Sequence, residues 1–350
     1  MKLSREELKS LMKNKLMQAG LHEDHADTTA EILTWSDERG YHSHGSVRVE
    51  YYSERIFKGG ITVDPKFTWK QTGPCSGIFD GDNGIGYVIA KEGMEKAIAL
   101  AKENGIGVVG MTNMSHSGSI GYYTEMAANE GLVAISFCQS DPMAVPYGGA
   151  EPYYGTNPIS FAAPTADDRK VVFDMATTVQ AWGKILDKKS RHESIPSDWA
   201  VGVDGAPVTD PNLVNALVPI SGAKGYGLMM LVDVFSGVLL GVPFGGHVSS
   251  MYHDLSEGRC LGQMHIVMDP NRFVGAEKFK KDMSQCLDEI GNIKPAPGFK
   301  KVNYPGERAE ERKNNAYATG GIEIVDEIVE YMRSKDIHYN RYDHKNRFAE

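Results

Sequence analysis

Residues 88–138 read VIAKEGMEKAIALAKENGIGVVGMTNMSHSGSIGYYTEMAANEGLVAISFC, and this stretch decides the fold class. A helical pattern over 88–104 leads into a short run of β-branched and glycine residues at 107–110. A second helical pattern at 118–130 leads into an apolar, strand-like run at 133–138. Because helices alternate with buried strands, the sequence predicts an α/β fold.

The rest of the chain adds strands in the middle and helices at both ends. Further short strands are predicted at 67–72, 76–80, 171–174 and 265–268. The first 60 residues are predicted to be helical, since Ser4 and Glu7 form a capping box and an apolar pattern runs from Glu23 to Glu38. A proline-rich linker is expected at 290–312, followed by two more helices.

Size and charge exclude several classes of protein. The chain has 350 residues, of which 41% are hydrophobic, so it can bury a sizeable core and is not mainly disordered. It carries 37 basic against 46 acidic residues, a formal net charge of −9. A chain this acidic has no overall field that attracts nucleic acid or an anionic membrane. We therefore expect a small-molecule ligand, and an anionic one would need a local cationic site.

The sequence also indicates a cellular compartment. The first residues, MKLSREELKSLMKNKL, are charged throughout and lack the apolar core of a secretory signal. The four cysteines form no CxxC pair, and we expect buried free thiols in a reducing compartment. The longest apolar stretch, 228–244, contains Asp233 and Pro243 and is predicted to be a buried helix. A cytoplasmic protein is expected.

The stretch Gly105-Ile-Gly-Val-Val-Gly110 matches the G-x-G-x-x-G fingerprint of dinucleotide-binding folds by its letters alone. That fingerprint must follow a strand and open a helix. Here a helix precedes the glycines, and Val108 and Val109 lie inside the predicted strand. We therefore interpret the stretch as a turn from helix to strand, not as a Rossmann phosphate loop.

The segment His42-Ser-His44-Gly-Ser46-Val-Arg48 is the first candidate for chemistry. The guanidinium of Arg48 offers a bidentate fork to a carboxylate, and Ser43 and His44 can add hydrogen bonds. Tyr52 follows one helical turn after Arg48. Two alternatives stay open: a solvated helix cap, and a metal site for which the H-x-H pair lacks a nearby third ligand.

Three further candidates follow predicted strands, where α/β proteins place ligands. His116 lies in Met114-Ser-His-Ser-Gly118 and can exchange protons near neutral pH. Ser140 and Asp141 follow the next strand, and Asp174-Met-Ala176 follows a later one. Hydroxyls and carboxylates there suit a ribose or an amide, and ordinary polar turns are the alternative interpretation.

Ser221-Gly-Ala-Lys224-Gly-Tyr-Gly227 opens the apolar helix. A glycine-rich helix start exposes backbone N–H groups, and Lys224 adds charge, so this segment is a candidate phosphate cradle. The spacing is not that of a Walker A motif. A Schiff-base role for Lys224 stays open as a weaker alternative.

The combination of motifs is more specific than any one of them. In order along the chain occur His42-Ser-His44-Gly, Asn113-Met-Ser-His116-Ser-Gly, Tyr154-Gly-Thr-Asn-Pro158, Phe173-Asp-Met-Ala176 and Lys224-Gly-Tyr-Gly227. Together they resemble the type-2 malate/lactate dehydrogenase family, which lacks a Rossmann fold. The resemblance covers essentially the whole chain.

This resemblance implies a homodimer that uses NAD(P) to oxidise a 2-hydroxy acid, and NAD is preferred on the resemblance alone. It implies a mixed-sheet, non-Rossmann cofactor domain at 66–304 and a helical domain built from 1–65 and 305–350. His116 is expected to be the general base, and Arg48 to hold the carboxylate with help from Ser43, His44 or Tyr52. Asp141 is expected on the substrate side. The residues expected to bind the cofactor are Ser140, Asp174, Met175, Ala176, Lys224, Gly306, Glu307 and Arg308.

Two other classes of function remain alternatives at this point. One is a metal-dependent hydrolase or lyase built on His42, His44 and His116. The other is a non-catalytic protein that senses a dinucleotide or an acid. Within the dehydrogenase interpretation, substrates of the malate or lactate type, with NAD or NADP, also stay open.

Overall fold

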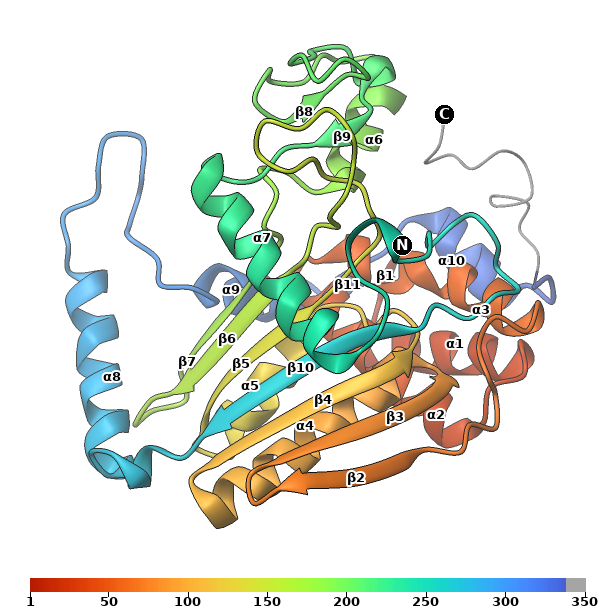
Figure 1. Ribbon diagram of the computed structural model, residues 1–350. Coiled ribbons are helices and arrows are strands. Elements are labelled where there is room, and N and C mark those ends of the chain that lie inside the picture. Colours follow the sequence, from red (N-terminus) through yellow and green to blue (C-terminus); the bar gives the residue numbers. More distant parts are fainter. Residues whose placement is uncertain (338–350) are drawn as a thin grey trace.

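The computed structural model describes residues 1–337 and has a seven-stranded sheet at its centre (Figure 1). The strands are β2 (Thr68–Gly73), β3 (Ser76–Gly84), β4 (Ile106–Met114), β5 (Val133–Cys138), β6 (Ile159–Pro164), β7 (Lys170–Met175) and β10 (Leu261–Met268). Their order across the sheet is β2-β3-β4-β10-β5-β6-β7. Within this sheet β3 and β4 run parallel, and every other neighbouring pair is antiparallel. The prediction of a mixed, non-Rossmann α/β sheet is thereby confirmed.

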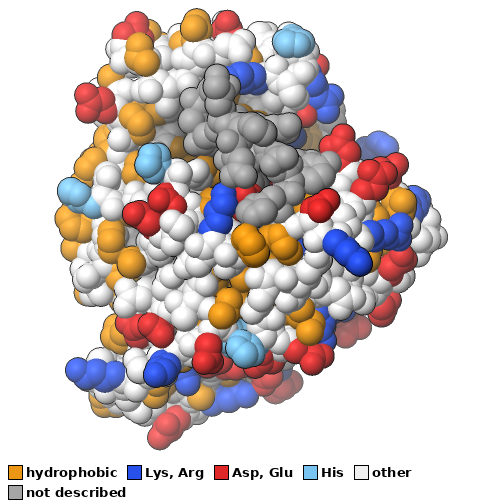
Figure 2. All heavy atoms as spheres, turned by 90° about the vertical axis from the view of Figure 1, so that its right-hand side faces the viewer, with side chains coloured by type: hydrophobic (Ala, Val, Ile, Leu, Met, Phe, Trp, Pro, Cys, Tyr) orange, Lys and Arg blue, Asp and Glu red, His pale blue; other side chains and the backbone are white. Residues whose placement is uncertain are grey.

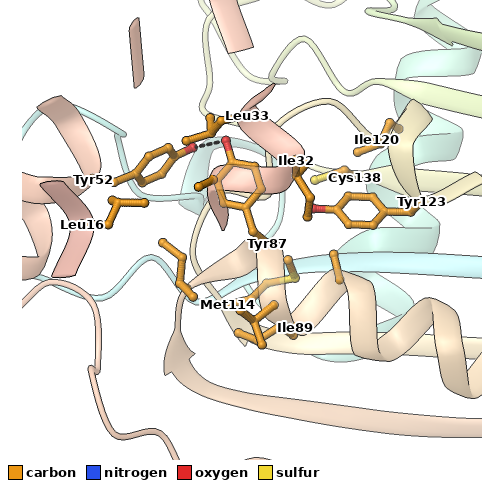
Figure 3. Packing of buried hydrophobic residues seen from close by; sticks show 14 of the residues in the cluster. Leu16, Ile32, Leu33, Tyr52, Tyr87, Ile89, Met114, Ile120, Tyr123 and Cys138 are labelled. Carbon is orange, nitrogen blue, oxygen red and sulfur yellow. Dashed lines mark hydrogen bonds between the residues drawn. The ribbon is translucent and has the colours of Figure 1, made fainter. Parts of the chain in front are cut away.

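Helices cover one face of the sheet in two layers (Figure 1). The inner layer is α4 (Gly86–Asn104) and α5 (Gly121–Asn129), which pack on the strands. The outer elements are α1 (Arg5–Gln18), α2 (Glu23–Glu38), α3 (Val49–Phe57), α10 (Asp326–Arg333) and the short strands β1 (Lys2–Leu3) and β11 (Ile322–Glu323). One buried apolar cluster runs through both layers, and Figure 3 shows part of it. The site described below is built against this cluster.

The two ends of the chain meet in the outer layer. β1 pairs with β11, and α1 packs against α10. The hydroxyl of Ser4 caps α1 by accepting the N–H of Glu7 at 3.1 Å, whereas the Glu7 carboxylate pairs with Arg333. The division into a helical and an α/β domain stays a prediction, because the largest core cluster is continuous across the expected boundary, and residues 338–350 lie outside the described part.

The glycines of the false fingerprint serve helix–strand packing. Gly105 ends α4 with a positive φ of 89°, and β4 starts at the next residue. A Cβ on Gly107 would lie 2.0 Å from the carbonyl oxygen of Ala97 in α4, so only glycine lets the strand approach the helix this closely. The interpretation as a turn from helix to strand is confirmed.

The apolar helix departs from its prediction. α7 (Ala223–Ser236) lies on the other face of the sheet, across β5 and β10 (Figure 1). Val232 packs against Phe137 and Met264, but much of the rest of the helix is exposed. The exposed apolar side chains here are Leu228, Met230, Leu231, Val234, Val238 and Leu239. The prediction of a buried helix is wrong, because no second layer among the described residues covers this side of α7.

The segment Ala223–Leu240 is the one described stretch that is long and apolar enough to cross a membrane by composition, and 33% of it is buried. It is not one continuous α-helix. α7 ends at Ser236, and a 3₁₀ turn follows at Val238–Leu240. Fourteen helical residues span about 20 Å, less than the ~30 Å of a bilayer core.

The remaining elements include several that were not anticipated. β6 and α6 (Trp182–Ser190) were not predicted, and α6 packs with the short strands β8 (Ala200–Val201) and β9 (Ala216–Leu217) into a separate apolar cluster. α8 (Ala276–Gly291) packs Leu287 against the edge of the sheet, and α9 (Glu307–Ala318) starts inside the expected linker. All four cysteines are free, but only Cys138 is buried, so the expectation of buried thiols is wrong for the others.

Charged side chains of both signs lie on the face of the molecule that Figure 2 shows. Figure 2 shows acidic and basic side chains interspersed over one face of the molecule. The expectation that the chain has no overall attraction for polyanions stays a prediction.

Candidate active site

A cavity of about 290 Å³ lies where the ends of β5 and β7 meet the two 3₁₀ turns at His42–His44 and Ser46–Arg48. The residues of the predicted site that line it are Ser43, His44, Arg48, His116, Ser140, Asp141, Asp174, Met175 and Ala176. They come from four separate stretches of sequence. The fold therefore brings together most of the residues that were predicted to share one site.

His116 follows β4 and lines this cavity, and contacts at Nδ1 hold its ring. Its Nδ1 lies 2.5 Å from the hydroxyl of Tyr52 and 3.3 Å from the backbone nitrogen of Gly118. Burial, helped by the nearby His44 and Arg48, holds the pKa of His116 well below its ordinary value. The imidazole is therefore neutral at neutral pH, which is the form that can accept a proton.

Arg48 is the cation of the substrate-side wall. Its Nε donates to the carbonyl of Ser43 at 2.7 Å, and its Nη1 donates to the hydroxyl of Tyr252 at 2.7 Å. The ring of His44 stacks on His116 with centroids 5.8 Å apart. Burial lowers the pKa of His44 to about 3, so Arg48 rather than His44 supplies positive charge here.

The turn that carries Ser43 and His44 is tied down by a buried carboxylate in α2. Asp37 accepts the backbone N–H of Ser46 at 2.7 Å and bonds Nδ1 of His42 at 3.0 Å. The Asp37 carboxylate raises the pKa of His42. A Cβ on Gly45 would lie 2.1 Å from Asp37, which explains the glycine between the two turns. His42 thus acts in holding the turn and does not line the cavity.

Asp141 lines the cavity but already has two partners in the protein. One oxygen accepts from Nη2 of Arg259 at 2.5 Å, and the other accepts the backbone N–H of Met251. Arg259 is fully buried and also donates to the carbonyl of Ser249 at 2.7 Å. This ion pair holds the segment that presents Tyr252 to Arg48. A direct contact of Asp141 with substrate stays a prediction.

Tyr52 is fully buried, and its hydroxyl bonds His116 rather than the guanidinium of Arg48. The structure therefore places it behind the expected base. Its expected aid to the substrate carboxylate stays a prediction. Sequence reasoning missed Tyr252, Arg259 and Trp182, which have no motif spacing and reach the site from distant segments.

The other wall of the cavity carries the residues expected to bind a cofactor. Ser140 Oγ lies 3.1 Å from Thr156 Oγ1. One oxygen of Asp174 accepts the backbone N–H of Gly121, at the start of α5, at 2.8 Å. Burial raises the pKa of Asp174 to about 6 despite that hydrogen bond. These groups offer hydroxyl and carboxylate contacts of the kind that a ribose needs.

A second cavity, of about 640 Å³, adjoins the first at Tyr41. Gly306 and Arg308 of the predicted site line it, together with Lys301 and Arg312. The two cavities share Tyr41 in their linings, and basic side chains line the second one. The basic side chains of the second cavity suit the phosphates of a ligand.

Two expected cofactor residues lie elsewhere. The carboxylate of Glu307 is taken up by Lys301 at 2.9 Å and Asn303 at 2.6 Å. Lys224 is exposed in the first turn of α7 and lines neither cavity. Their contacts with a cofactor stay predictions.

The histidines do not assemble a metal site. Within residues 1–337, no group of three or more His, Cys, Asp or Glu side chains is arranged to hold a metal ion. His42 is paired with Asp37, and Nδ1 of His116 is taken by Tyr52. The donor set therefore does not favour the metal-dependent alternative.

Comparison with known proteins adds to this geometry. A sequence profile of the malate/L-lactate dehydrogenase family matches residues 3–333. The chain is 57% identical over 350 residues, all of both chains, to "Ureidoglycolate dehydrogenase (NAD(+))" of Escherichia coli O157:H7. Its fold matches the sulfolactate dehydrogenase of Methanocaldococcus jannaschii (TM-score 0.89, 35% identity, 96% of each chain) and the malate dehydrogenase of Pyrococcus horikoshii (TM-score 0.86, 33% identity, 95% of this chain and 93% of that one). The chain belongs to the malate/L-lactate dehydrogenase family.

Proposed function

We propose that this protein is an NAD-dependent dehydrogenase that oxidises (S)-ureidoglycolate to oxalurate, a step in the breakdown of allantoin and purine nitrogen. The full-length likeness at 57% identity to an enzyme named for this substrate and for NAD carries the proposal. The cavity supports it, because a neutral buried histidine and an arginine face the same space. These are the two groups that oxidation of a 2-hydroxy acid needs, a base and a carboxylate clamp.

In the proposed mechanism the substrate carboxylate binds the guanidinium of Arg48, with Ser43 and His44 beside it. The hydroxyl oxygen then lies near His116, whose Nδ1 is already bonded to Tyr52 and whose Nε2 is left to accept the hydroxyl proton. Loss of the proton and of the Cα hydride leaves a carbonyl group. The positive charge on Arg48 is fixed by Tyr252 and the Ser43 carbonyl, so binding orients the substrate at little entropic cost.

The residues on the other wall fit a nicotinamide dinucleotide. Ser140 and the stretch Asp174–Ala176 would hold the nicotinamide half, and Gly306 and Arg308 the half with the phosphates. When bound, the nicotinamide supplies the hydride acceptor. Gly306 has a positive φ of 96°, and a Cβ there would lie 2.9 Å from the carbonyl oxygen of Val172, so glycine lets this turn pack closely against β7. Glu307 and Lys224 remain proposed contacts.

Asp141 is the proposed acceptor for the N–H groups of the ureido end of the substrate. A carboxylate oxygen can accept more than one hydrogen bond, so the bonds from Arg259 and Met251 leave capacity. Malate and lactate have no ureido group and no need for such an acceptor. Its role can be tested with the Asp141→Asn and Arg259→Gln double variant, which avoids leaving a buried charge unpaired.

We further propose a homodimer in which a second copy covers the exposed apolar side of α7. Leu231, Val234 and Val238 are 36%, 42% and 51% exposed, which is unusual for a contiguous group on a soluble chain. A Leu231→Glu variant should lower the mass measured by light scattering from that of two chains to that of one. An unchanged mass would place the contact elsewhere. A cytoplasmic location stays a prediction.

The deciding experiment measures NADH formation with (S)-ureidoglycolate beside (S)-malate, (S)-lactate and (S)-sulfolactate, with NAD and NADP in parallel. A strong preference for ureidoglycolate with NAD supports the proposal. Preference for malate or sulfolactate, the substrates in the names of structural relatives, would keep the roles of His116 and Arg48 and make Asp141 a structural residue.

Two controls separate the other classes of function. Activity that survives chelation with EDTA removes the metal-dependent alternative. Release of urea and glyoxylate without NADH would indicate a lyase, and NAD binding without turnover of any hydroxy acid would indicate a sensor.

A further inference from the structure

Two buried tyrosine hydroxyls lie in line behind the imidazole of His116. Tyr52 comes from α3 and Tyr87 from the first turn of α4, and both side chains are fully buried. The Tyr52 hydroxyl lies 2.5 Å from Nδ1 of His116 and 3.1 Å from the hydroxyl of Tyr87. Figure 3 shows these two hydroxyls pointing toward each other inside the apolar core. Polar groups buried in such surroundings are costly unless they are paired.

The pairing bears on which nitrogen of His116 carries its hydrogen. A neutral imidazole has one N–H and one lone pair. A base that works on the cavity side needs its lone pair at Nε2, so Nδ1 must carry the hydrogen. Nδ1–H can then donate to the Tyr52 oxygen only if the Tyr52 hydrogen points elsewhere, and the Tyr87 oxygen is the acceptor in reach.

A competing contact makes the direction of this chain matter. The backbone N–H of Gly118 points at Nδ1 from 3.3 Å and favours a lone pair there. If the Tyr52 hydroxyl also donated to Nδ1, the imidazole would be held as Nε2–H. That form offers the cavity a hydrogen instead of a lone pair and cannot accept the substrate proton.

We propose that Tyr87, acting through Tyr52, is a positioning residue that keeps His116 in the Nδ1–H form by accepting the Tyr52 hydrogen. This inference rests on the proposed role of His116 as the base. In the reaction the substrate O–H bond breaks, its proton joins Nε2, and Nδ1–H stays bonded to Tyr52. Both tyrosines remain protonated throughout, in keeping with the burial that raises the pKa of Tyr52 well above 10.

The first test reads the hydrogen positions without any turnover. Protein labelled with ¹⁵N-histidine is studied by long-range ¹H–¹⁵N NMR, and His116 is assigned by comparison with His116→Ala. We expect a protonated Nδ1 and an unprotonated Nε2 in the wild type, and the reverse in Tyr87→Phe. A wild-type protein that is already protonated at Nε2 overturns the proposal. The outcome does not depend on which substrate is oxidised, so it is independent of the proposed function.

The second test separates positioning from stability. Tyr87→Phe keeps the ring in the core, and we expect kcat to fall roughly tenfold with an unchanged KM for the hydroxy acid, because only the base is affected. Tyr331→Phe is the matched control, since it removes a buried hydroxyl that donates to the Ile337 carbonyl at 3.0 Å. Its kcat should stay at the wild-type value. Equal losses in the two variants, or a change in KM alone for Tyr87→Phe, contradict the proposal.

Discussion

The substrate end and the cofactor end of the site differ in how fully the protein itself holds them. The His116 ring is hydrogen-bonded to the Tyr52 hydroxyl, Arg48 donates to the Ser43 carbonyl and to Tyr252, and Asp37 fixes the turn that carries Ser43 and His44. At the other end, Arg308 lines the second cavity, where its Nε donates to Asn303, and Lys224 is exposed and lines neither cavity. The substrate-side groups therefore share one cavity before any ligand arrives, whereas Arg308 and Lys224 lie outside the cavity that Ser140 and Asp174 line.

The largest effect should come from the base. His116→Ala is expected to lower kcat by about 10²–10⁴-fold, because the proton then has no acceptor in the cavity. NAD binding, followed by fluorescence titration, should be unchanged, since the expected cofactor contacts lie on the other wall. Unchanged turnover would remove His116 from the mechanism, and loss of NAD binding would show that the two ends are not separable.

Arg48 should come next. Arg48→Ala removes a charged hydrogen-bonding partner of the substrate, and a loss of about 1.5–3 kcal/mol corresponds to a roughly 10- to 100-fold fall in kcat/KM. Both KM and kcat should worsen, because the carboxylate also orients the hydroxyl. Arg48→Lys keeps the charge and loses the fork, so it should recover part of the activity. A change confined to the KM for NAD would show that the clamp is assigned to the wrong ligand.

At the cofactor end single substitutions should matter less. Arg308→Ala is expected to raise the KM for NAD about two- to tenfold and to leave the KM for the hydroxy acid unchanged. Arg272→Ala, an exposed arginine that bonds the Glu103 carbonyl, is the matched control and should have no effect on either constant. An effect of Arg308→Ala on the hydroxy acid would mean that the two cavities act as one site.

The smallest effect is the pH dependence of the free energy of unfolding. It has opposite signs at the substrate end, which contains His44, and at the cofactor end, which contains Asp174. The pKa of His44 is lowered in the folded state, so the stability it confers is present above pH 6.5 and is lost as the pH falls toward 3. The pKa of Asp174 is raised from 3.8 to about 6, so its contribution is present below pH 3.8 and is lost as the pH rises through 6.

Urea unfolding at several pH values checks this contrast. Asp174→Asn should be more stable than the wild type at pH 7 by about 1 kcal/mol. This is less than the full pKa shift would give, because water partly screens a carboxyl that lines a cavity. At pH 4 most of the difference should vanish. His44→Gln should instead gain on the wild type in acid. A pH-independent offset for either variant would contradict the link to titration.

The sequence predicted the elements whose local pattern is strong. The bounds of α2 and of β5 agree with the pattern at Glu23–Glu38 and Val133–Cys138, and the glycines at 105–110 were correctly separated from a phosphate loop. Residues that follow strands, such as His116 and Asp174, could be predicted to share a site because the ends of neighbouring strands meet at one edge of the sheet. The prediction that failed was the burial of α7. Its apolar pattern indicates that the helix packs against the protein, but not that only one of its sides is covered.

The partners within the site could not be predicted for the same reason. Arg259 pairs with Asp141 across 118 positions of sequence, and Tyr252 reaches Arg48 across 204. Neither distance leaves a local signature. Tyr52 was singled out by its spacing from Arg48, but Arg48 lies in the 3₁₀ turn before α3, and the Tyr52 hydroxyl meets His116 instead.

The order of the strands has a consequence for synthesis on the ribosome. β10 sits between β4 and β5 in the sheet but comes far later in the chain. At roughly 5–20 residues per second, β4 and β5 wait on the order of ten seconds with unpaired edges before β10 emerges. Open strand edges invite pairing with other chains. Yield in a cell should therefore depend on translation speed and on chaperones that shield nascent strands, and fragments that stop before residue 261 should aggregate instead of forming a smaller domain.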